Sequence, residues 1–257
     1  MFQKKSLGQN FLKSKKVLSD IVQAGKIQPG ETVLEIGPGE GSLTEVLLSA
    51  GAKVVAVEKD RRLIPVLKQK FAKEIANGSL TLNEADILDF NPSSSLKASS
   101  YKLIANIPYY ITGMILEKFL SGENPPTLMV LMVQKEVAER IMARDGKESI
   151  LSMSVKVYGT PRYVGTVKAG NFVPAPNVDS AILAIENISK KFFADVSEEK
   201  FFAVMKAGFA HKRKQLLGNL KTNWPNITTE TLIKIGLNPK IRAEDLTLEN
   251  WLVLARN

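Results

Sequence analysis

A glycine-rich loop that joins a predicted strand to a predicted helix constrains the fold more than any other feature of the sequence. Thr32–Ile36 is a short apolar run typical of a buried parallel strand, and Gly37-Pro38-Gly39-Glu40-Gly41 follows it directly. Beyond the loop, apolar residues recur at helical spacing, at Leu43, Val46, Leu47 and Ala50. Glycines at such a junction allow a sharp turn and the close approach of a ligand. The sequence therefore predicts a strand, a ligand-binding loop and a helix of an α/β protein.

Acidic residues end the next two predicted strands. Lys53–Val57 is followed by Glu58, and Leu80–Ala85 is followed by Asp86. A carboxylate about 20 residues beyond a glycine loop is placed to accept hydrogen bonds from both hydroxyls of an adenosine ribose. Asp86 could accept from the adenine amine, with Ile87 packed on the ring. Both acids could equally be ordinary surface charges at strand ends. Their order behind the glycine loop favours a nucleoside-binding half-domain.

The spacing of the glycines separates two classes of nucleoside cofactor. A dinucleotide-binding motif also places glycines and an acid at this separation. Here the pattern is G-x-G-x-G, and Ser42 stands where the dinucleotide motif requires its third glycine for close helix packing. Together with Asp86, this pattern favours S-adenosylmethionine as the cofactor.

The segment Asn106-Ile107-Pro108-Tyr109 follows another apolar run and is suited to holding a planar amine against an electrophile. The side-chain oxygen of Asn106 and the carbonyl of Ile107 could accept hydrogen bonds from adenine N6, favouring the pyramidal nitrogen of the transition state. Tyr109 would stack on the flipped base. The alternative is a strand end followed by a proline turn, which many α/β proteins contain.

Together these residues resemble the ribosomal RNA adenine N6,N6-dimethyltransferase family, most closely its KsgA type, over nearly the whole chain. The resemblance begins at Gly8-Gln9-Asn10-Phe11-Leu12. It implies that Asn10 and Leu12 contact the methionine end of the cofactor, and that Asn106 serves both the cofactor and the target amine. The further cofactor contacts that it implies are Gly37, Gly39, Glu58 and Asp86.

The segment 171–180 resembles the family's aromatic loop. The resemblance implies that Phe172 is a second stacking surface opposite Tyr109, so that both belong with Asn106 to the catalytic group. The alternative is a proline-stiffened loop with Phe172 in the core. Two segments depart from the family: Tyr110–Met114 replaces a small polar pair, and Lys147–Ser152 replaces a stretch that usually carries Tyr and Gly.

The composition excludes several kinds of chemistry. The 257 residues include no cysteine, which rules out disulfides and thiolate metal sites, and the single histidine, His211, leaves no cluster for zinc or for a Ser-His nucleophile. No metal is therefore expected, and methyl transfer from a sulfonium requires none. The sequence has no signal-peptide h-region and no apolar run long enough to span a bilayer, so we expect a cytoplasmic protein without a membrane partner.

Alternating strands and helices predict an α/β fold with a doubly wound, mainly parallel sheet and helices on both faces. Thr127–Val133 is a further predicted strand, and Tyr163–Val167 and Ser180–Ile185 read as a closing pair. The resemblance implies seven strands in the Rossmann-like class I fold of S-adenosylmethionine-dependent methyltransferases. A polar connection after Asn187 predicts a boundary between a cofactor-binding catalytic domain, 1–187, and a small α-helical RNA-binding domain, 188–257.

The expected C-terminal domain carries a basic cluster. Its first helix is marked by Phe201, Phe202, Met205 and Phe209, and His211-Lys212-Arg213-Lys214-Gln215 follows. The net charge of +9 suits a polyanionic partner, although a solvated helix face is the usual explanation of a short charge run. Gly208–Leu216 resembles the family's C-terminal basic helix, which implies RNA binding by Lys212, Arg213 and Lys214.

The resemblance implies dimethylation of two adjacent adenosines near the 3′ end of 16S (small-subunit) rRNA, within an assembling 30S subunit, by a monomeric enzyme. Two alternatives remain. A 23S rRNA adenine methyltransferase of the antibiotic-resistance type shares the catalytic motif, but Val178-Asp179-Ser180 and the basic cluster favour the small-subunit enzyme. A non-enzymatic RNA-binding assembly or transcription factor could retain the fold, but the intact glycine loop, Glu58, Asp86 and Asn106 favour catalysis.

Overall fold

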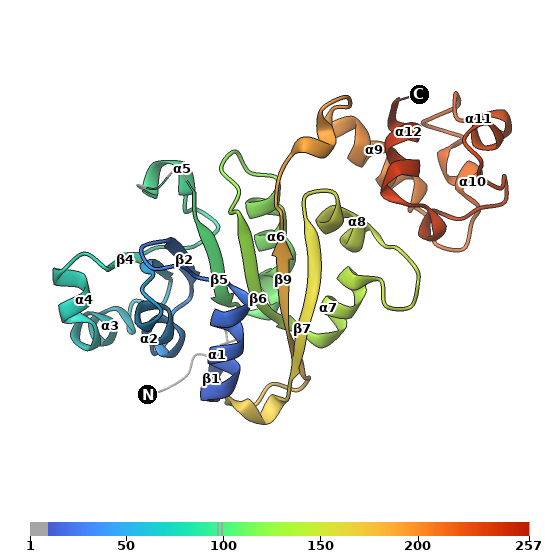
Figure 1. Ribbon diagram of the computed structural model, residues 1–257. Coiled ribbons are helices and arrows are strands. Elements are labelled where there is room, and N and C mark those ends of the chain that lie inside the picture. The colour runs from blue at the N-terminus through green and yellow to red at the C-terminus, as the bar shows by residue number, and fades with distance from the viewer. Residues whose placement is uncertain (1–9, 97, 99, 257) are drawn as a thin grey trace. The chain divides into compact units, whose positions relative to one another are not determined.

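The computed structural model describes residues 10–96, 98 and 100–256 (Figure 1). Gly8 and Gln9, with which the family resemblance begins, lie outside the described residues. By their internal contacts the described residues divide into two compact units. The first comprises residues up to 138 together with 160–188, and the second comprises 139–159 together with 189 onwards.

A seven-stranded sheet forms the centre of the first unit, with the strands in the order β4-β3-β2-β5-β6-β9-β7. The first five are parallel, whereas β9 runs antiparallel to both of its neighbours. The predicted mainly parallel seven-stranded sheet is confirmed. The bounds are β2 (Thr32–Ile36), β3 (Lys53–Glu58), β4 (Leu80–Glu84), β5 (Lys102–Asn106), β6 (Leu128–Gln134), β7 (Thr160–Val167) and β9 (Ser180–Glu186).

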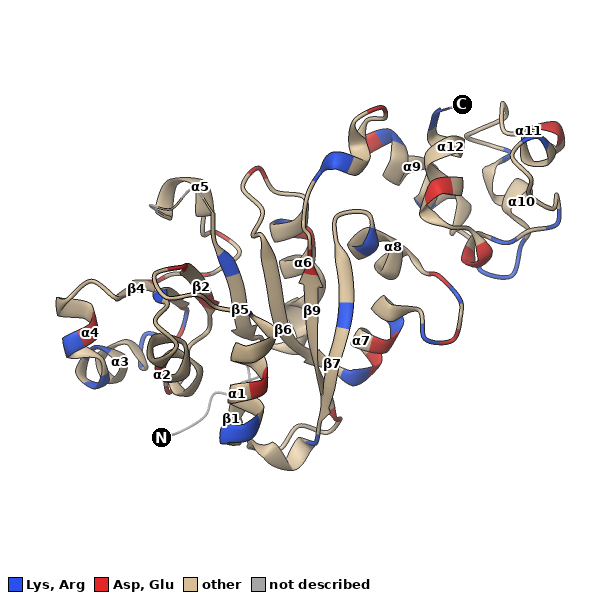
Figure 2. Ribbon diagram, in the orientation of Figure 1, with Lys and Arg blue, Asp and Glu red and all other residues tan. Residues whose placement is uncertain are grey.

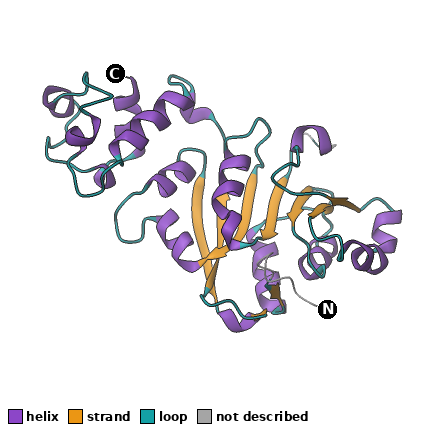
Figure 3. Ribbon diagram, turned by 180° about the vertical axis from the view of Figure 1, so that it is seen from behind, coloured by secondary structure: helices purple, strands orange, loops and turns teal. Residues whose placement is uncertain are grey.

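Helices cover both faces of this sheet. α1 crosses one face and α6 the other, as the two opposite views show (Figures 1 and 3). Because both faces are covered, the central strands are mainly apolar, and Leu34, Ile104 and Val130 are fully buried. The helices are α1 (Lys15–Ala24), α2 (Ser42–Ser49), α3 (Ile64–Lys70), α4 (Ala72–Ala76), α5 (Pro92–Ser95), α6 (Thr112–Leu120) and α7 (Lys135–Met142), which reaches into the second unit.

A second, two-stranded sheet ties the N-terminal segment to the loop before β9. β1 (Phe11–Leu12) pairs antiparallel with β8 (Phe172–Val173), which places Leu12 opposite Phe172. The backbone N–H of Lys13 donates to the carbonyl of Asn171, which extends the pairing. The sequence pattern predicts neither strand, because two residues are too few to show a periodicity.

The segment Lys147–Ser152, which departs from the family pattern, packs within the second unit. The ammonium of Lys147 pairs with the buried carboxylate of Glu244, and the backbone N–H of Glu148 donates to the Glu244 carbonyl. Ser149 and Ser152 form a capping box at the start of α8 (Ile150–Lys156). The segment therefore has a structural role. Residues 139–159 pack with the second unit although they precede the boundary expected after residue 187.

The basic cluster of the second unit lies on a loop, which corrects the expected basic helix. α9 (Glu198–Gly208) ends before the cluster, because the side chain of Asn219 donates to the carbonyls of Gly208 and His211 and holds the chain in turns. Figure 2 shows basic residues on the loops of this unit. The remaining elements are α10 (Leu216–Leu220), α11 (Thr229–Lys234) and α12 (Leu248–Arg256), with short 3-10 turns at Lys191–Phe193 and Ala243–Asp245.

Candidate functional site

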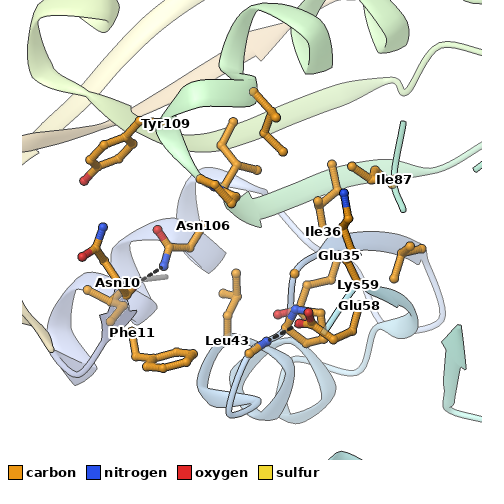
Figure 4. A pocket seen from close by; sticks show the side chains of 18 of the residues that line it. Asn10, Phe11, Glu35, Ile36, Leu43, Glu58, Lys59, Ile87, Asn106 and Tyr109 are labelled. Atoms are coloured by element: carbon orange, nitrogen blue, oxygen red, sulfur yellow. Dashed lines mark hydrogen bonds between the residues drawn. The ribbon is translucent and has the colours of Figure 1, made fainter. Parts of the chain in front are cut away.

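The carboxyl ends of β2, β3, β4 and β5 meet at one edge of the sheet, where they surround a cleft (Figure 4). Ligands of open α/β sheets bind at this edge. The structure brings most of the predicted residues together in the lining of this cleft: Asn10, Leu12, Gly37, Gly39, Glu58, Asp86, Asn106 and Tyr109. Phe172, Lys212, Arg213 and Lys214 do not line it.

The glycine loop adopts a backbone that other residues rarely take. Gly37, Gly39 and Gly41 have φ angles of 63°, 61° and 78°. A Cβ added to Gly39 would lie 2.8 Å from the ring of Phe11, so the N-terminal strand packs where a side chain would otherwise project. The local sequence thus explains the tight turn between β2 and α2, whose residues Gly37 and Gly39 line the cleft.

Glu58 is held in place by the backbone of the glycine loop. Its side chain is 5% exposed; one carboxylate oxygen accepts the N–H of Gly39 at 3.1 Å and the other that of Asp60 at 2.8 Å. Burial raises the pKa of the carboxyl above its usual value. A carboxylate has about four lone-pair positions, so Glu58 can still accept from two ligand hydroxyls.

Asp86 is paired with a lysine that the sequence analysis did not single out. The ammonium of Lys59 lies 2.5 Å from one carboxylate oxygen, and the backbone N–H of Leu88 donates to the other at 3.0 Å. The Lys59 hydrogen bond holds the pKa of Asp86 below its usual value. Lys59 lines the cleft next to Glu58, and this adjacency is the only sequence signal that could have found it.

Asn106 is oriented by the N-terminal segment. Its Nδ2 donates to the backbone carbonyl of Asn10 at 3.1 Å, so Oδ1 is the atom left to accept a hydrogen bond from a ligand (Figure 4). A side-chain amide fixed in this way needs no further ordering when an amine binds.

Tyr109 is oriented by a buried serine of β9. The Tyr109 hydroxyl lies 2.5 Å from the Oγ of Ser180, which is fully buried. Burial raises the pKa of the Tyr109 phenol above its usual value. Ser180 belongs to the Val178-Asp179-Ser180 motif, yet its contact with Tyr109 joins residues 71 positions apart and was not predicted.

Two apolar side chains of the atypical Tyr110–Met114 segment are exposed in the cleft lining. Tyr110 is 60% exposed and Met114 is 44% exposed. Where the family pattern has a small polar pair, this chain therefore presents an apolar rim.

Phe172, the predicted second stacking surface, lies in the core of this structure. Its side chain is 2% exposed and belongs to the core cluster that contains Leu12 and Val167. Side chains alternate along β8, so pairing with β1 turns Phe172 inward and leaves its neighbour Val173 52% exposed. The ring of Phe172 therefore packs in the core and does not line the cleft.

Phe172→Ala is expected to destabilise the protein by about 3 to 4 kcal/mol, because it leaves a cavity in the core. Urea unfolding measures this change. The matched control is Val173→Ala, which truncates the exposed neighbour and should change the free energy of unfolding by less than about 0.5 kcal/mol. A Phe172→Ala protein that keeps its full stability but loses methyl transfer would contradict the core assignment.

Glu35 of β2 is a further residue that the sequence analysis missed. It is 1% exposed and lines the cleft, and burial raises its pKa to about 8. The available signal was a lone acid inside an otherwise apolar strand. Among the described residues no group of acidic or histidine side chains is arranged to hold a metal ion. No helix in the described part of the chain is long and apolar enough to span a membrane.

Comparisons with known proteins agree on one family. A model of ribosomal RNA adenine dimethylase matches residues 2–256. The ribosomal RNA small subunit methyltransferase A of Dehalococcoides mccartyi is 41% identical, over 98% of this chain and 87% of that protein. The enzyme of the same name from Lactobacillus acidophilus is 39% identical, over 99% of this chain and 90% of that protein.

Two solved structures have the same fold along nearly the whole chain. A dimethyladenosine transferase from Plasmodium falciparum has a TM-score of 0.81 and 29% identity, and the match covers 95% of each chain. The 23S rRNA methyltransferase ErmE has a TM-score of 0.79 and 25% identity, over 96% of this chain and 98% of that one.

Proposed function

The chain belongs to the ribosomal RNA adenine dimethylase family, and on this premise we propose that it dimethylates N6 of two adjacent adenosines near the 3′ end of 16S rRNA. It is an rRNA adenine methyltransferase, and the relatives named for the small subunit match it over nearly their full length. The observation that carries the proposal is the meeting of Asn106 and Tyr109 with the glycine loop, Glu58 and Asp86 in one cleft.

S-adenosylmethionine is the proposed cofactor, and the cleft fits its parts. Glu58 would accept hydrogen bonds from the ribose hydroxyls and Asp86 from the adenine amine, while the buried Ile87 would pack on the ring. Asn10 and Leu12, with the backbone of the loop at Gly37 and Gly39, would hold the methionine end. The bound cofactor supplies a methyl group on an already activated sulfonium.

The target amine would be held by neutral acceptors. Oδ1 of Asn106 and the carbonyl of Ile107 would accept hydrogen bonds from the two N–H groups of the amine and favour a pyramidal nitrogen. The Tyr109 ring would stack on the flipped base. The hydrogen bond between the Tyr109 hydroxyl and Ser180 Oγ fixes the ring before the base binds. An amide suits two successive transfers, because after the first methyl one N–H remains and no charged acceptor is left unpaired.

Lys212, Arg213 and Lys214 are proposed to bind RNA phosphates. All three are exposed on the loop after α9. Replacing the three by alanine should weaken RNA binding and reduce the slope of log affinity against log salt concentration by about 2 to 3. Filter binding at several salt concentrations measures this slope.

The control removes the same charge from three other exposed lysines of this unit, Lys221, Lys234 and Lys240. Equal losses of slope in the two variants would show that the loop binds no phosphates of its own and acts only through net charge.

We further propose that the enzyme acts as a monomer in the cytoplasm, on an assembling 30S subunit. Incubation with labelled cofactor and unmethylated small or large subunits in parallel, followed by mapping of dimethyladenosines, tests the substrate. Label in 16S rRNA alone is expected. Label only in 23S rRNA would overturn the assignment, and a chain that binds no S-adenosylmethionine in a calorimetric titration would instead be a non-enzymatic RNA-binding factor.

A further inference from the structure

Glu35 is a buried acid in the wall of the cleft to which the proposed mechanism gives no task. It is the penultimate residue of β2, two positions before Gly37 of the glycine loop, and only 1% of it is exposed. Its Oε2 is buried and has no hydrogen-bond partner among the described residues. A buried polar atom without a partner is destabilising by about 1 to 3 kcal/mol, so its retention at a ligand site calls for an explanation.

The groups around Glu35 decide its charge. The pKa of Glu35 is raised to about 8, mainly by burial and in part by the carboxyl of Glu58 on β3. Thr44 of α2 and the ammonium of Lys70 on α3 oppose this rise. Lys70 is itself engaged elsewhere, because it pairs with Glu45 and lies over the ring of Phe71. Glu35 is therefore mostly neutral at pH 7 in the cleft as it stands.

We propose that Glu35 distinguishes the cationic cofactor from its neutral product, being protonated in the empty cleft and ionised when a sulfonium occupies it. This inference rests on the proposed use of S-adenosylmethionine at this site. In a cleft of low dielectric, a positive charge stabilises a nearby carboxylate far more than it does in water. Glu35 is buried in the lining of the cleft in which the proposed cofactor would lie, and its Oε2 has no hydrogen-bond partner among the described residues.

The positive charge on sulfur is lost during the reaction, and the protonation state of Glu35 changes with it. The methyl–sulfur bond breaks with its electron pair left on sulfur, a carbon–nitrogen bond forms at N6, and the nitrogen loses a proton to solvent. The sulfonium thus becomes a neutral thioether, S-adenosylhomocysteine. Glu35 then has no cation to face and takes a proton from water, which removes the charge-dependent part of the affinity and favours release of the product.

Proton counting by calorimetry tests this directly. The full chain is titrated at pH 7.5 with S-adenosylmethionine and with S-adenosylhomocysteine, each in several buffers of different ionisation enthalpy. We expect cofactor binding to release roughly half a proton more per site than product binding. Both ligands carry the ribose that Glu58 would contact, so any proton change at Glu58 is common to both and cancels in the difference.

The matched variant is Glu35→Gln, which keeps the size of the side chain and cannot ionise. In this variant the difference in proton release between S-adenosylmethionine and S-adenosylhomocysteine should be about half a proton smaller than in the wild type. It need not vanish, because the amino group of the ligand titrates in both proteins. An undiminished excess in Glu35→Gln would overturn the proposal. Failure of both ligands to bind the wild type would instead contradict the proposed function.

A second ligand pair makes the test independent of any variant and of the amine. 5′-Methylthioadenosine and its S-methylsulfonium derivative differ only in one methyl group and its positive charge, and both lack the α-amino group of S-adenosylmethionine and S-adenosylhomocysteine. Binding of the sulfonium releases a proton from Glu35. The affinity of the protein for the sulfonium, divided by its affinity for the thioether, should therefore rise about fivefold or more between pH 6.5 and 8.5. A ratio of affinities that stays flat over this range would overturn the proposal.

Discussion

Asn106→Ala is expected to lower the rate of methyl transfer by about 100- to 1000-fold, the usual effect of removing one preorganised hydrogen-bonding group from a transition state. The amide of Asn106 is fixed by its bond to the Asn10 carbonyl, so alanine removes an acceptor that is already in position. RNA affinity should change little, because phosphate contacts dominate it. Single-turnover assays with labelled cofactor and unmethylated small subunits measure the rate.

The control for this variant is Asn223→Ala, which truncates an exposed asparagine of the second unit that does not line the cleft. It should transfer methyl groups at the wild-type rate. Cofactor affinity of Asn106→Ala, measured by calorimetry, separates the two proposed tasks of this residue. A near-normal yield of dimethyladenosine from Asn106→Ala, quantified by mass spectrometry, would rule out its catalytic role.

Glu58→Ala is expected to weaken binding of S-adenosylmethionine by about 100-fold or more, since each hydrogen bond to a charged group contributes about 1.5 to 3 kcal/mol. The variant loses the acceptor of the ribose hydroxyls. It also leaves the N–H of Gly39 without the carboxylate that now holds the glycine loop. Calorimetric titration measures the dissociation constant, and circular dichroism checks that the variant is folded.

Glu84→Ala is a closely matched control for Glu58→Ala. The two glutamates are paired in register on neighbouring strands at the same edge of the sheet, but Glu84 does not line the cleft. Its carboxylate forms an exposed ion pair with Arg61, which contributes little to stability. Equal losses of cofactor affinity in the two variants would mean that Glu58 acts only through the net charge of this edge.

The three polar residues Glu58, Asp86 and Asn106 of the cleft could be predicted because they follow strands. Glu58, Asp86 and Asn106 each stand at or just beyond the end of an apolar run, and the carboxyl ends of parallel strands meet at one edge. The glycine loop could also be predicted from the sequence, since its backbone angles are ones that glycine adopts readily. In these cases the position of a residue at the site follows from the strand or turn that its immediate sequence neighbours form.

Features that the sequence did not predict have a different origin. A motif predicts a stacking role for Phe172, but the burial of its ring depends on the pairing of β8 with β1, about 160 residues away. The basic residues after α9 were assigned to a helix, but the side chain of Asn219 holds that segment in turns. The first outcome depends on a partner that is distant in the sequence, and the second on side-chain hydrogen bonds that the spacing of apolar residues does not reveal.

The sequence by itself determined the order of strands and helices, the turn of the glycine loop and the chemical types of the side chains at the strand ends, because these depend on local spacing and backbone preference. Only the tertiary structure decided that Ser180 orients Tyr109, that Lys59 pairs with Asp86 and that Glu35 is buried beside the loop. Burial and pairing join segments that are distant in the chain, and the charge of an acid follows from the surroundings that this packing creates.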